Sequence, residues 1–362
     1  TSNIKLSIFL HELPVKIGIR LIGLVGLLPY SVLVFLGKGT GIIMLFLARH
    51  RRRIATQNFR LCYPELDKKQ RKKLLLENFI STGIGLMETA FCWTASSDRI
   101  KSVAELTGRE HLATILDSGQ GAIVLGFHLT SLELGGCALA HHIPIAAMYR
   151  QHRNKHFEKA MCKGRLNNVT DVIEREDVRN MIRSLKNGKA VWYAADQDYG
   201  AHHSIFVPFF NYPAATIIAT SRFVKLTKVP VIPMTHYRDK KTGKLLIQLH
   251  PPLENFTAKD DYTDALAINQ FLENFLQQFP ADYLWVHRRF KTRPPGMPSL
   301  YDPKSLYKIK IMQDATFNSL VSGADLVEGT EKKPLLLKLT SGDYLKFIYR
   351  SRILQPSPAR KF

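Results

Sequence analysis

The stretch GFHLTSLELGG, residues 126–136, places His128 at the end of a short apolar run and Glu133 five residues later. A carboxylate beside an imidazole orients the ring and makes it a better base toward an alcohol. Ser131 is a candidate N-cap for a helix whose first turn contains Glu133, where negative charge is stabilising. The same residues are also typical of a loop histidine followed by a capping glutamate. Spacing alone leaves both interpretations open, since the chain has 13 histidines and 30 acidic residues.

Polar side chains follow two further apolar runs. Asp196 and Asp198 come directly after the run 190–195, and Arg150 follows another. In open parallel sheets, ligands gather beyond the carboxyl ends of the strands. If these runs are strands, we expect the three side chains and His128 to meet at one edge of a sheet.

Short apolar runs alternate with helical stretches from about residue 104 onward. The runs predict strands over 122–127, 145–149, 190–195, 229–234 and 245–249. The remaining stretches predict helices over 54–93, 132–141, 156–166, 178–186, 214–227 and 264–279. Asp67 and Asp177 are candidate N-caps, and Gly188 is a candidate C-terminal stop. Strands that alternate with helices predict an α/β domain with helices on the faces of a mostly parallel sheet.

The N-terminal region contains a long apolar stretch. Residues 17–36 carry one charge, Arg20, and a membrane span needs about 20 apolar residues. Pro29 weakens a straight spanning helix, so an interfacial anchor or a buried core helix are the alternatives. A second apolar run, 42–48, precedes the basic residues 49–53, which are typical of a cytoplasmic flank.

The chain divides into three expected regions. Residues 1–53 form a membrane anchor with a basic flank, 54–301 the main domain, and 302–362 a C-terminal extension. The extension contains LLLKLTSGDYLKFIY, which predicts a β-hairpin with its turn at Ser341-Gly342. The sequence indicates no role for it.

The chain is strongly basic. It has 51 Lys and Arg against 30 Asp and Glu, a net charge of +21. Such a field attracts nucleic acid, anionic lipid, phosphorylated ligands or acidic proteins without choosing among them. The basic runs 49–53 and 287–293 are candidates for contact with an anionic partner or the membrane surface, or they are solvated faces.

Metal and disulfide chemistry are not indicated. The four cysteines contain no C-x-x-C pair, so we expect reduced, partly buried thiols. The histidine pairs 141–142 and 202–203 are neighbours in sequence, which seldom face one metal, and no H-E-x-x-H motif occurs. We therefore expect neither a metal nor a cofactor.

A family resemblance adds to these observations. GFHLTSLELGG resembles the H-x4-D/E motif of membrane acyltransferases, and further segments resemble the lipid A late acyltransferase family in the same order along the chain. These segments are LPYSVL, RRRIATQNFRLCYPEL, MYRQHRN, KGRLNN, WYAADQDYG, SIFVPFF and DYLWVHRRFKTRPPGMPSLY. The resemblance covers roughly residues 10–301. The sequences DQDYG and HRRFKTRP are closer to those of the lauroyl-type members.

The resemblance implies a function and a set of roles. Such enzymes resemble glycerolipid acyltransferases in fold and move a fatty acyl chain from acyl carrier protein to a hydroxyl of a hydroxyacyl chain on Kdo(2)-lipid IV(A). It implies His128 as the catalytic base and Glu133 as its carboxylate partner. Arg165 and Asp196 fall on the family's functional arginine and acid, as substrate-binding or orienting groups. It also implies an inner-membrane location with a cytoplasmic site, partners that are acyl carrier protein, lipid A precursor and membrane, and no nucleic acid.

The chemistry of the residues agrees with that implication. Ester formation from a thioester needs a base for the acceptor hydroxyl and no metal. We expect direct transfer, because the chain has no G-x-S-x-G elbow, with backbone N–H groups near 129–133 as candidate oxyanion donors. Two alternatives stay open: an acyltransferase for another glycolipid or glycerolipid, and a non-catalytic, basic, membrane-attached binding protein.

Overall fold

The computed structural model describes residues 2–254, 256–302, 325–327, 335–338, 344–350 and 353–357. Its helices are α1 (Ser2–Gly26), α2 (Tyr30–Leu47), α3 (Arg49–Cys62), α4 (Lys68–Thr94), α5 (Ser97–Val103), α6 (Arg109–Asp117), α7 (Leu132–Ala140), α8 (Lys155–Leu166), α9 (Val178–Lys186), α10 (Ala219–Thr227), α11 (Asp261–Gln278) and the short η1 (Pro280–Asp282). Its strands are β1 (Ala104–Thr107), β2 (Ala122–Gly126), β3 (Ile145–Tyr149), β4 (Asp171–Glu174), β5 (Ala190–Ala194), β6 (Ser204–Phe209), β7 (Tyr212–Ile217), β8 (Val231–Arg238), β9 (Leu245–Leu249), β10 (Asp325–Val327), β11 (Leu335–Lys338), β12 (Tyr344–Arg350) and β13 (Ile353–Ser357).

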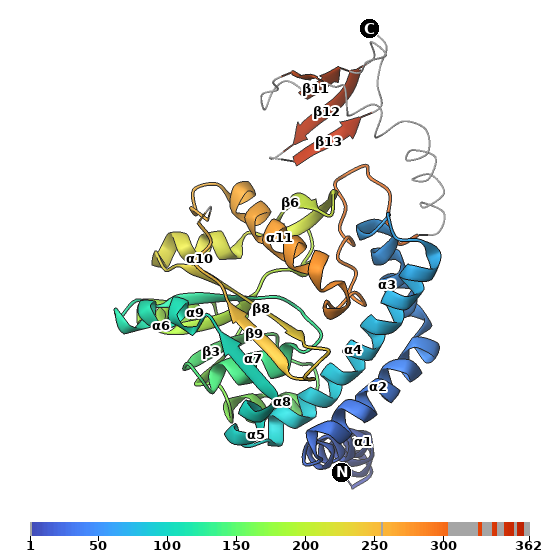
Figure 1. The fold of residues 1–362 in the computed structure, drawn as a ribbon, viewed down its shortest axis with the longest axis vertical. Helices are drawn as coiled ribbons and strands as arrows, with labels where there is room; N and C mark the ends of the chain where they lie inside the picture. The colour runs from blue at the N-terminus through green and yellow to red at the C-terminus, as the bar shows by residue number, and fades with distance from the viewer. Residues whose placement is uncertain are drawn as a thin grey trace.

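Seven strands form the central sheet, which helices flank (Figure 1). Their order is β1-β9-β8-β2-β5-β3-β4. Every neighbouring pair is parallel except β8 and β9. The prediction of an α/β domain with a mostly parallel sheet is therefore confirmed. The predicted strands 145–149 and 245–249 match β3 and β9, and the predicted helix 178–186 matches α9. Asp67 caps α4 in a capping box, and Asp177 caps α9, as predicted.

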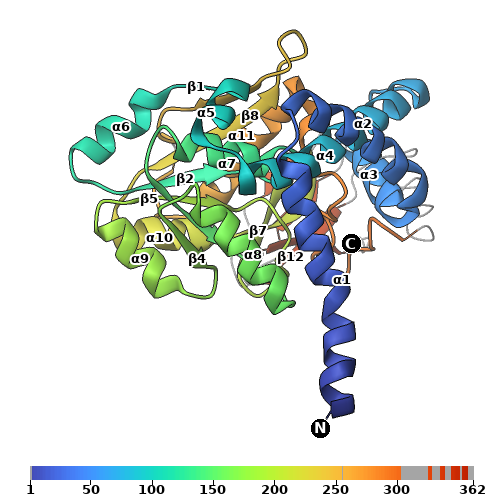
Figure 2. The same ribbon diagram turned by 90° about the horizontal axis from the view of Figure 1, so that it is seen from below.

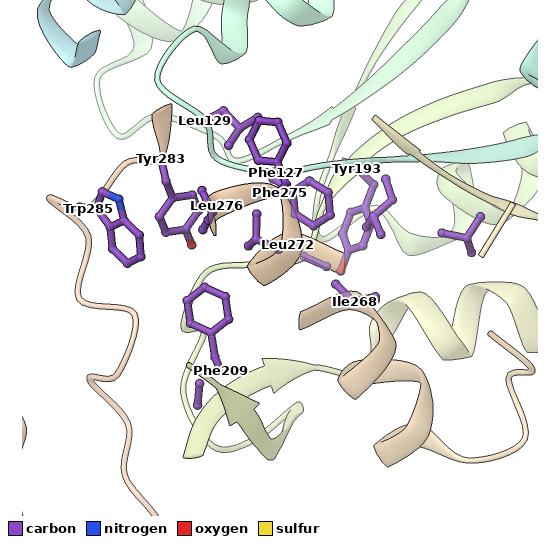
Figure 3. Packing of buried hydrophobic residues seen from close by; sticks show 14 of the residues in the cluster. Phe127, Leu129, Tyr193, Phe209, Ile268, Leu272, Phe275, Leu276, Tyr283 and Trp285 are labelled. Carbon is purple, nitrogen blue, oxygen red and sulfur yellow. The ribbon is translucent and has the colours of Figure 1, made fainter. Parts of the chain in front are cut away.

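The core lies in two layers, because alternate residues of a strand point to opposite faces of a sheet. On one face, Leu125 of β2 shares a buried cluster with Leu272 of α11. On the other face, Val124 of β2 shares a second cluster with Leu134 of α7. Figure 3 shows part of the first cluster, in which Phe127, just beyond β2, lies beside the side chains of α11. The chain that leads into the candidate site is therefore fixed by packing on both faces.

The N-terminal apolar stretch forms two helices rather than one. The break falls at Pro29, which has no N–H with which to continue α1. A single span over 17–36 is therefore wrong in its bounds. Among the described residues, α2 is long and apolar enough to cross a membrane, which by itself is weak evidence for a span. Its side chains are largely exposed, Phe35 at 74% and Leu47 at 77%. The N-terminal end of α1 projects away from the α/β body (Figure 2), while the helix also contacts α4 and α8.

Glycines bring α2 close to α4. A Cβ on Gly83 of α4 would lie 2.3 Å from the backbone oxygen of Gly37, and one on Gly41 would lie 2.3 Å from that of Phe79. Small residues permit such close approach of two helix backbones. The GKGTG segment, residues 37–41, is thus a helix-packing surface.

The predicted helix 214–227 begins too early. Its first residues belong to β7, which pairs with β6, and α10 starts at Ala219. The turn residues Phe210 and Asn211 have φ of 48° and 63°, as a two-residue hairpin turn requires. Since no glycine marks this turn, the hairpin was missed. The short strands β1 and β4 and the helix α6 were missed as well.

The described C-terminal strands form a separate antiparallel sheet in the order β10-β11-β12-β13. β11 pairs with β12, with Leu335 opposite Phe347, which confirms the predicted hairpin. Its expected turn at Ser341-Gly342 lies outside the described residues. The division of the chain at 53 and 301 stays a prediction.

Candidate active site

His128 and Asp196 form a hydrogen-bonded pair at the carboxyl edge of the sheet. β2 and β5 are parallel neighbours, with Gly126 opposite Ala194. His128 lies two residues after Gly126, and Asp196 lies two residues after Ala194. The Nδ1 atom of His128 lies 2.8 Å from Oδ1 of Asp196. The backbone N–H of His128 donates to Oδ2 of Asp196 at 3.0 Å. The two strands therefore bring together residues that are 68 positions apart.

Asp196 is fully buried and ionised in this arrangement. Burial raises the pKa of its carboxyl, but the charge of His128 and the hydrogen bonds from that residue outweigh burial, so the pKa lies below its ordinary value. The His128 side chain is 21% exposed and lines a cavity. With Nδ1–H donating to the carboxylate, Nε2 carries the lone pair that can accept a proton.

Hydrogen bonds tie the loop after β2 to the first residues of the last family motif, 282–301. Leu284 N–H donates to the carbonyl of His128 at 3.0 Å, and Thr130 N–H donates to that of Asp282 at 2.8 Å. Asn78 of α4 donates to the carbonyl of Tyr283 at 2.7 Å. These contacts fix the backbone on both sides of the histidine. The sequence offered no signal for Asn78, while the long motif at 282–301 did mark this segment.

Glu133 pairs with Arg165, not with His128. The guanidinium Nε and Nη2 atoms of Arg165 donate to the two carboxylate oxygens at 2.9 and 2.8 Å. Trp93 Nε1 also donates to Glu133, at 3.4 Å. Burial lowers the pKa of Arg165, but the hydrogen bonds and charge of Glu133 raise it by a larger amount. The net shift of this pKa is therefore upward. The expected His128–Glu133 contact is thus replaced by His128–Asp196, because strand register places Asp196 beside the ring while α7 directs Glu133 toward α8.

The start of α7 is held by a buried polar cluster that sequence reasoning missed. Ser131 is the residue before the helix, as predicted, yet its hydroxyl does not cap it. Instead Ser131 Oγ accepts a hydrogen bond from Arg238 at 3.2 Å. Arg238 also pairs with Glu88, which is 1% exposed, and donates to the Tyr30 hydroxyl at 2.6 Å. The cluster links α2, α4, β8 and the start of α7.

The second acid of the D-x-D stretch is directed elsewhere. Asp198 accepts hydrogen bonds from the backbone N–H and the hydroxyl of Thr292, at 2.6 and 2.7 Å. In the same basic run, Arg289 is fully buried and donates to the carbonyl of Ala215 at 2.8 Å. Arg293 donates to the carbonyl of Pro213 at 2.7 Å. These arginines hold the β6–β7 hairpin, so the run 287–293 is in part internal rather than a surface for a partner.

A cavity of about 810 Å³ joins the site together. The polar residues in its wall include His128, Glu133, Arg165 and Arg150. Asp196 is fully buried behind this wall and contacts His128. Apolar side chains form much of the remaining wall, among them Leu86, Met148, Trp192, Phe223 and Leu226. An elongated apolar group can therefore lie against the imidazole of His128, which Asp196 holds by a hydrogen bond. The backbone N–H groups of residues 129, 130 and 132 donate to other carbonyls, which removes three of the expected oxyanion donors.

Comparison with known proteins agrees with this geometry. Residues 6–292 match the model of the bacterial lipid A biosynthesis acyltransferases. The chain is 36% identical over 291 residues to the lipid A biosynthesis lauroyltransferase of Escherichia coli (79% of this chain, 94% of that protein). It is 35% identical over 275 residues to the palmitoleoyltransferase of the same organism (76% and 90%), and 29% identical over 266 residues to its myristoyltransferase (73% and 82%). The match over most of the chain shows that it belongs to the bacterial lipid A biosynthesis acyltransferases.

Proposed function

We propose that the protein transfers a fatty acyl chain from acyl-[acyl-carrier-protein] to a hydroxyl of a hydroxyacyl chain of Kdo(2)-lipid IV(A). The observation that carries this proposal is the His128–Asp196 pair in the wall of an apolar cavity. The similar lauroyl-, palmitoleoyl- and myristoyltransferases support the acyl donor class. The residues of the D-Q-D-Y-G and H-R-R-F-K-T-R-P motifs are closer to those of the lauroyl-type members, which act on the Kdo-bearing precursor, and this supports that acceptor.

His128 is the general base in the proposed mechanism. Its Nε2 takes the proton of the acceptor hydroxyl as the oxygen attacks the thioester carbonyl. The tetrahedral intermediate then expels the pantetheine thiolate, which takes the proton back from the imidazolium, so that an ester and a thiol leave. Asp196 keeps Nδ1 protonated and stabilises the transient imidazolium. No acyl-enzyme is formed.

The Glu133–Arg165 pair has a different proposed role. Glu133 occupies Nε and Nη2 of Arg165 and so fixes the plane of the guanidinium group. Arg165 lines the cavity, and its Nη1 group is our candidate donor to the developing oxyanion. Glu133 thus acts through Arg165 as a positioning residue.

The location follows from the same proposal. An acidic carrier protein and a phosphorylated lipid both suit a chain with a net charge of +21. We place α2 in the inner membrane as the anchor and the cavity on the cytoplasmic side, where the basic residues 49–53 flank the helix. Residues 54–301 form the acyltransferase domain in this proposal, and no cofactor is needed beyond the acyl donor.

Acyl transfer by purified protein tests the proposal. The assay pairs lauroyl-, myristoyl- and palmitoleoyl-carrier protein with Kdo(2)-lipid IV(A), and with glycerol 3-phosphate as a rival acceptor. We expect transfer to the lipid A precursor, and loss of that activity in His128→Ala. His111→Ala is the matched control, since His111 is absent from the cavity wall. Transfer to glycerol 3-phosphate alone would contradict the proposed acceptor. Full activity of His128→Ala would contradict the proposed base.

A further inference from the structure

Two arginines occupy matching positions on neighbouring strands of the same sheet edge. β3 and β4 are parallel, with Tyr149 opposite Glu174, and Arg150 and Arg175 are the next residues on each strand. The backbone N–H of Arg175 donates to the carbonyl of Tyr149 at 2.8 Å, which holds the two strand ends together. The β3–β4 register therefore places these two arginines at matching positions on neighbouring strands of the edge that carries His128 and Asp196.

Both arginines face the cavity, together with a third. Arg150, Arg175 and Arg222 of α10 all line its wall. The guanidinium of Arg175 lies 5.8 Å from the centre of the Tyr199 ring. Burial and the charge of Asp196 raise the pKa of Tyr199, while the charges of Arg175 and Arg150 oppose that rise, so both arginines act on the same hydroxyl. α10, which carries Arg222, packs against α9, the helix that follows Arg175.

The positive charge of this rim is only partly neutralised within the described residues. Arg165 is matched by Glu133, and Arg175 contacts Glu176, whose side chain is 73% exposed. In the described part of the chain, neither Arg150 nor Arg222 has an acidic partner within ion-pair distance. The rim therefore presents uncompensated guanidinium groups to whatever enters the cavity.

Position along the sheet sets how far this rim is from the reacting atoms. The strand order β2-β5-β3-β4 places Arg150 two strands from His128 and Arg175 three strands away. Strands lie about 4.8 Å apart, so the rim is roughly 10–15 Å from the base along the sheet edge. A group bound there belongs to a substrate whose reactive centre lies at His128, and guanidinium forks match phosphate oxygens in geometry and charge.

We propose that Arg150, Arg175 and Arg222 form a phosphate-binding site on the cavity rim, separate from the catalytic pair. This inference rests on the proposed function for its substrates. The phosphate has two possible sources: the phosphate esters of the glycolipid acceptor, or the phosphodiester that joins the acyl-bearing arm to the carrier protein. Both present the same chemistry, and the rim would fix the register of that substrate against His128.

A binding experiment tests the site without any catalytic readout. Inorganic pyrophosphate is titrated into the full chain by calorimetry at constant chloride concentration. We expect the Arg150→Gln/Arg175→Gln double variant to bind at least about tenfold more weakly than the wild type. Arg150→Lys/Arg175→Lys keeps the charge and should fall between them, because lysine cannot make the bidentate contact. Arg179→Gln is the matched control, since it removes a charge from α9 but lies outside the cavity wall. Equal affinity in all four proteins would overturn the site.

Kinetics then identify the source of the phosphate. The Gln double variant should show a raised KM for one substrate and a nearly unchanged kcat. If the defect vanishes with an acyl-pantetheine donor that lacks the phosphodiester, the rim binds the donor. If it vanishes with a dephosphorylated acceptor, the rim binds the acceptor. A defect that persists with both phosphate-free substrates overturns the proposal. Should the wild type transfer no acyl group at all, the proposed function fails, and the pyrophosphate titration still decides the site.

Discussion

Replacement of Asp196 by Asn tests which carboxylate controls the histidine. In the structure Asp196 receives both the ring Nδ1–H and the backbone N–H of His128, at 2.8 and 3.0 Å. Asn keeps one oxygen, which can still accept from the backbone, and turns an amide NH2 toward the ring. Nδ1 must then act as an acceptor, the ring proton moves to Nε2, and Nε2 can no longer take a proton from a hydroxyl.

The expected loss is large, and it falls on the chemical step. In a buried His–Asp pair, an exchange that reverses the tautomer lowers kcat by about ten-thousand-fold, or about 5.5 kcal/mol of transition-state free energy. Because Asp196 does not line the cavity, KM for either substrate should stay close to that of the wild type. The fold should survive, since the substitution preserves side-chain size and both hydrogen bonds, one of them with its direction reversed.

The assay measures kcat and KM for acyl transfer, with nitrogen NMR of the ring to assign the tautomer of His128. The double variant His128→Ala/Asp196→Asn should be no slower than His128→Ala alone, because the two residues act as a unit. A kcat within about tenfold of the wild type, together with a correctly folded protein, would refute the assignment of Asp196 as the partner of the base.

Three further predictions follow from other contacts. Glu133→Gln leaves the Arg165 guanidinium without its counter-charge, so we expect about 2 kcal/mol lower stability in chemical unfolding and at least about tenfold lower kcat; unchanged stability would show that the pair is not coupled. Burial raises the pKa of Asp282 from 3.8 to about 6, so the stability contributed by its neutral form is full below about pH 4 and is lost as pH rises through about 6. Asp282→Asn should therefore remove up to about 3 kcal/mol of the difference in unfolding free energy between pH 4 and pH 8; an unchanged pH profile would contradict this. Gly83→Leu should separate α2 from α4 and expose α2 to limited proteolysis, whereas Gly39→Leu, at a position with open space around its Cα, should not.

The residue types of the site were predictable from sequence, but one of their pairings was not. The motifs named His128, Glu133, Arg165 and Asp196 as candidates, and the structure places them as two hydrogen-bonded pairs in or beside one cavity. Local spacing placed Glu133 near His128, yet a contact between side chains depends on which strands are neighbours and in what register. That information comes from the packing of the whole sheet, and a motif within one loop does not contain it.

Elements were predictable where local signals agreed with the final packing. Asp67 and Asp177 marked helix starts because a capping side chain acts within its own turn. The β6–β7 hairpin was missed because Phe210 and Asn211 adopt left-handed conformations without a glycine to signal them. The burial of polar groups such as Glu88 was also not predictable from the sequence. An acid on a helical stretch is expected to be exposed unless its distant partner is known.

The D-x-D stretch shows why motifs far apart in the chain belong to one site. Asp196 and Asp198 are two residues apart on the loop after β5, and they hold two different segments, the loop after β2 through His128 and the basic run through Thr292. The basic run in turn anchors the β6–β7 hairpin through buried Arg289. Loss of Asp198 should therefore disturb the hairpin before it disturbs the base, although the two acids are near neighbours. The loop after β5 thus connects the histidine to the last motif, because its two acids bind one segment each. Separation along the sequence does not predict this connection.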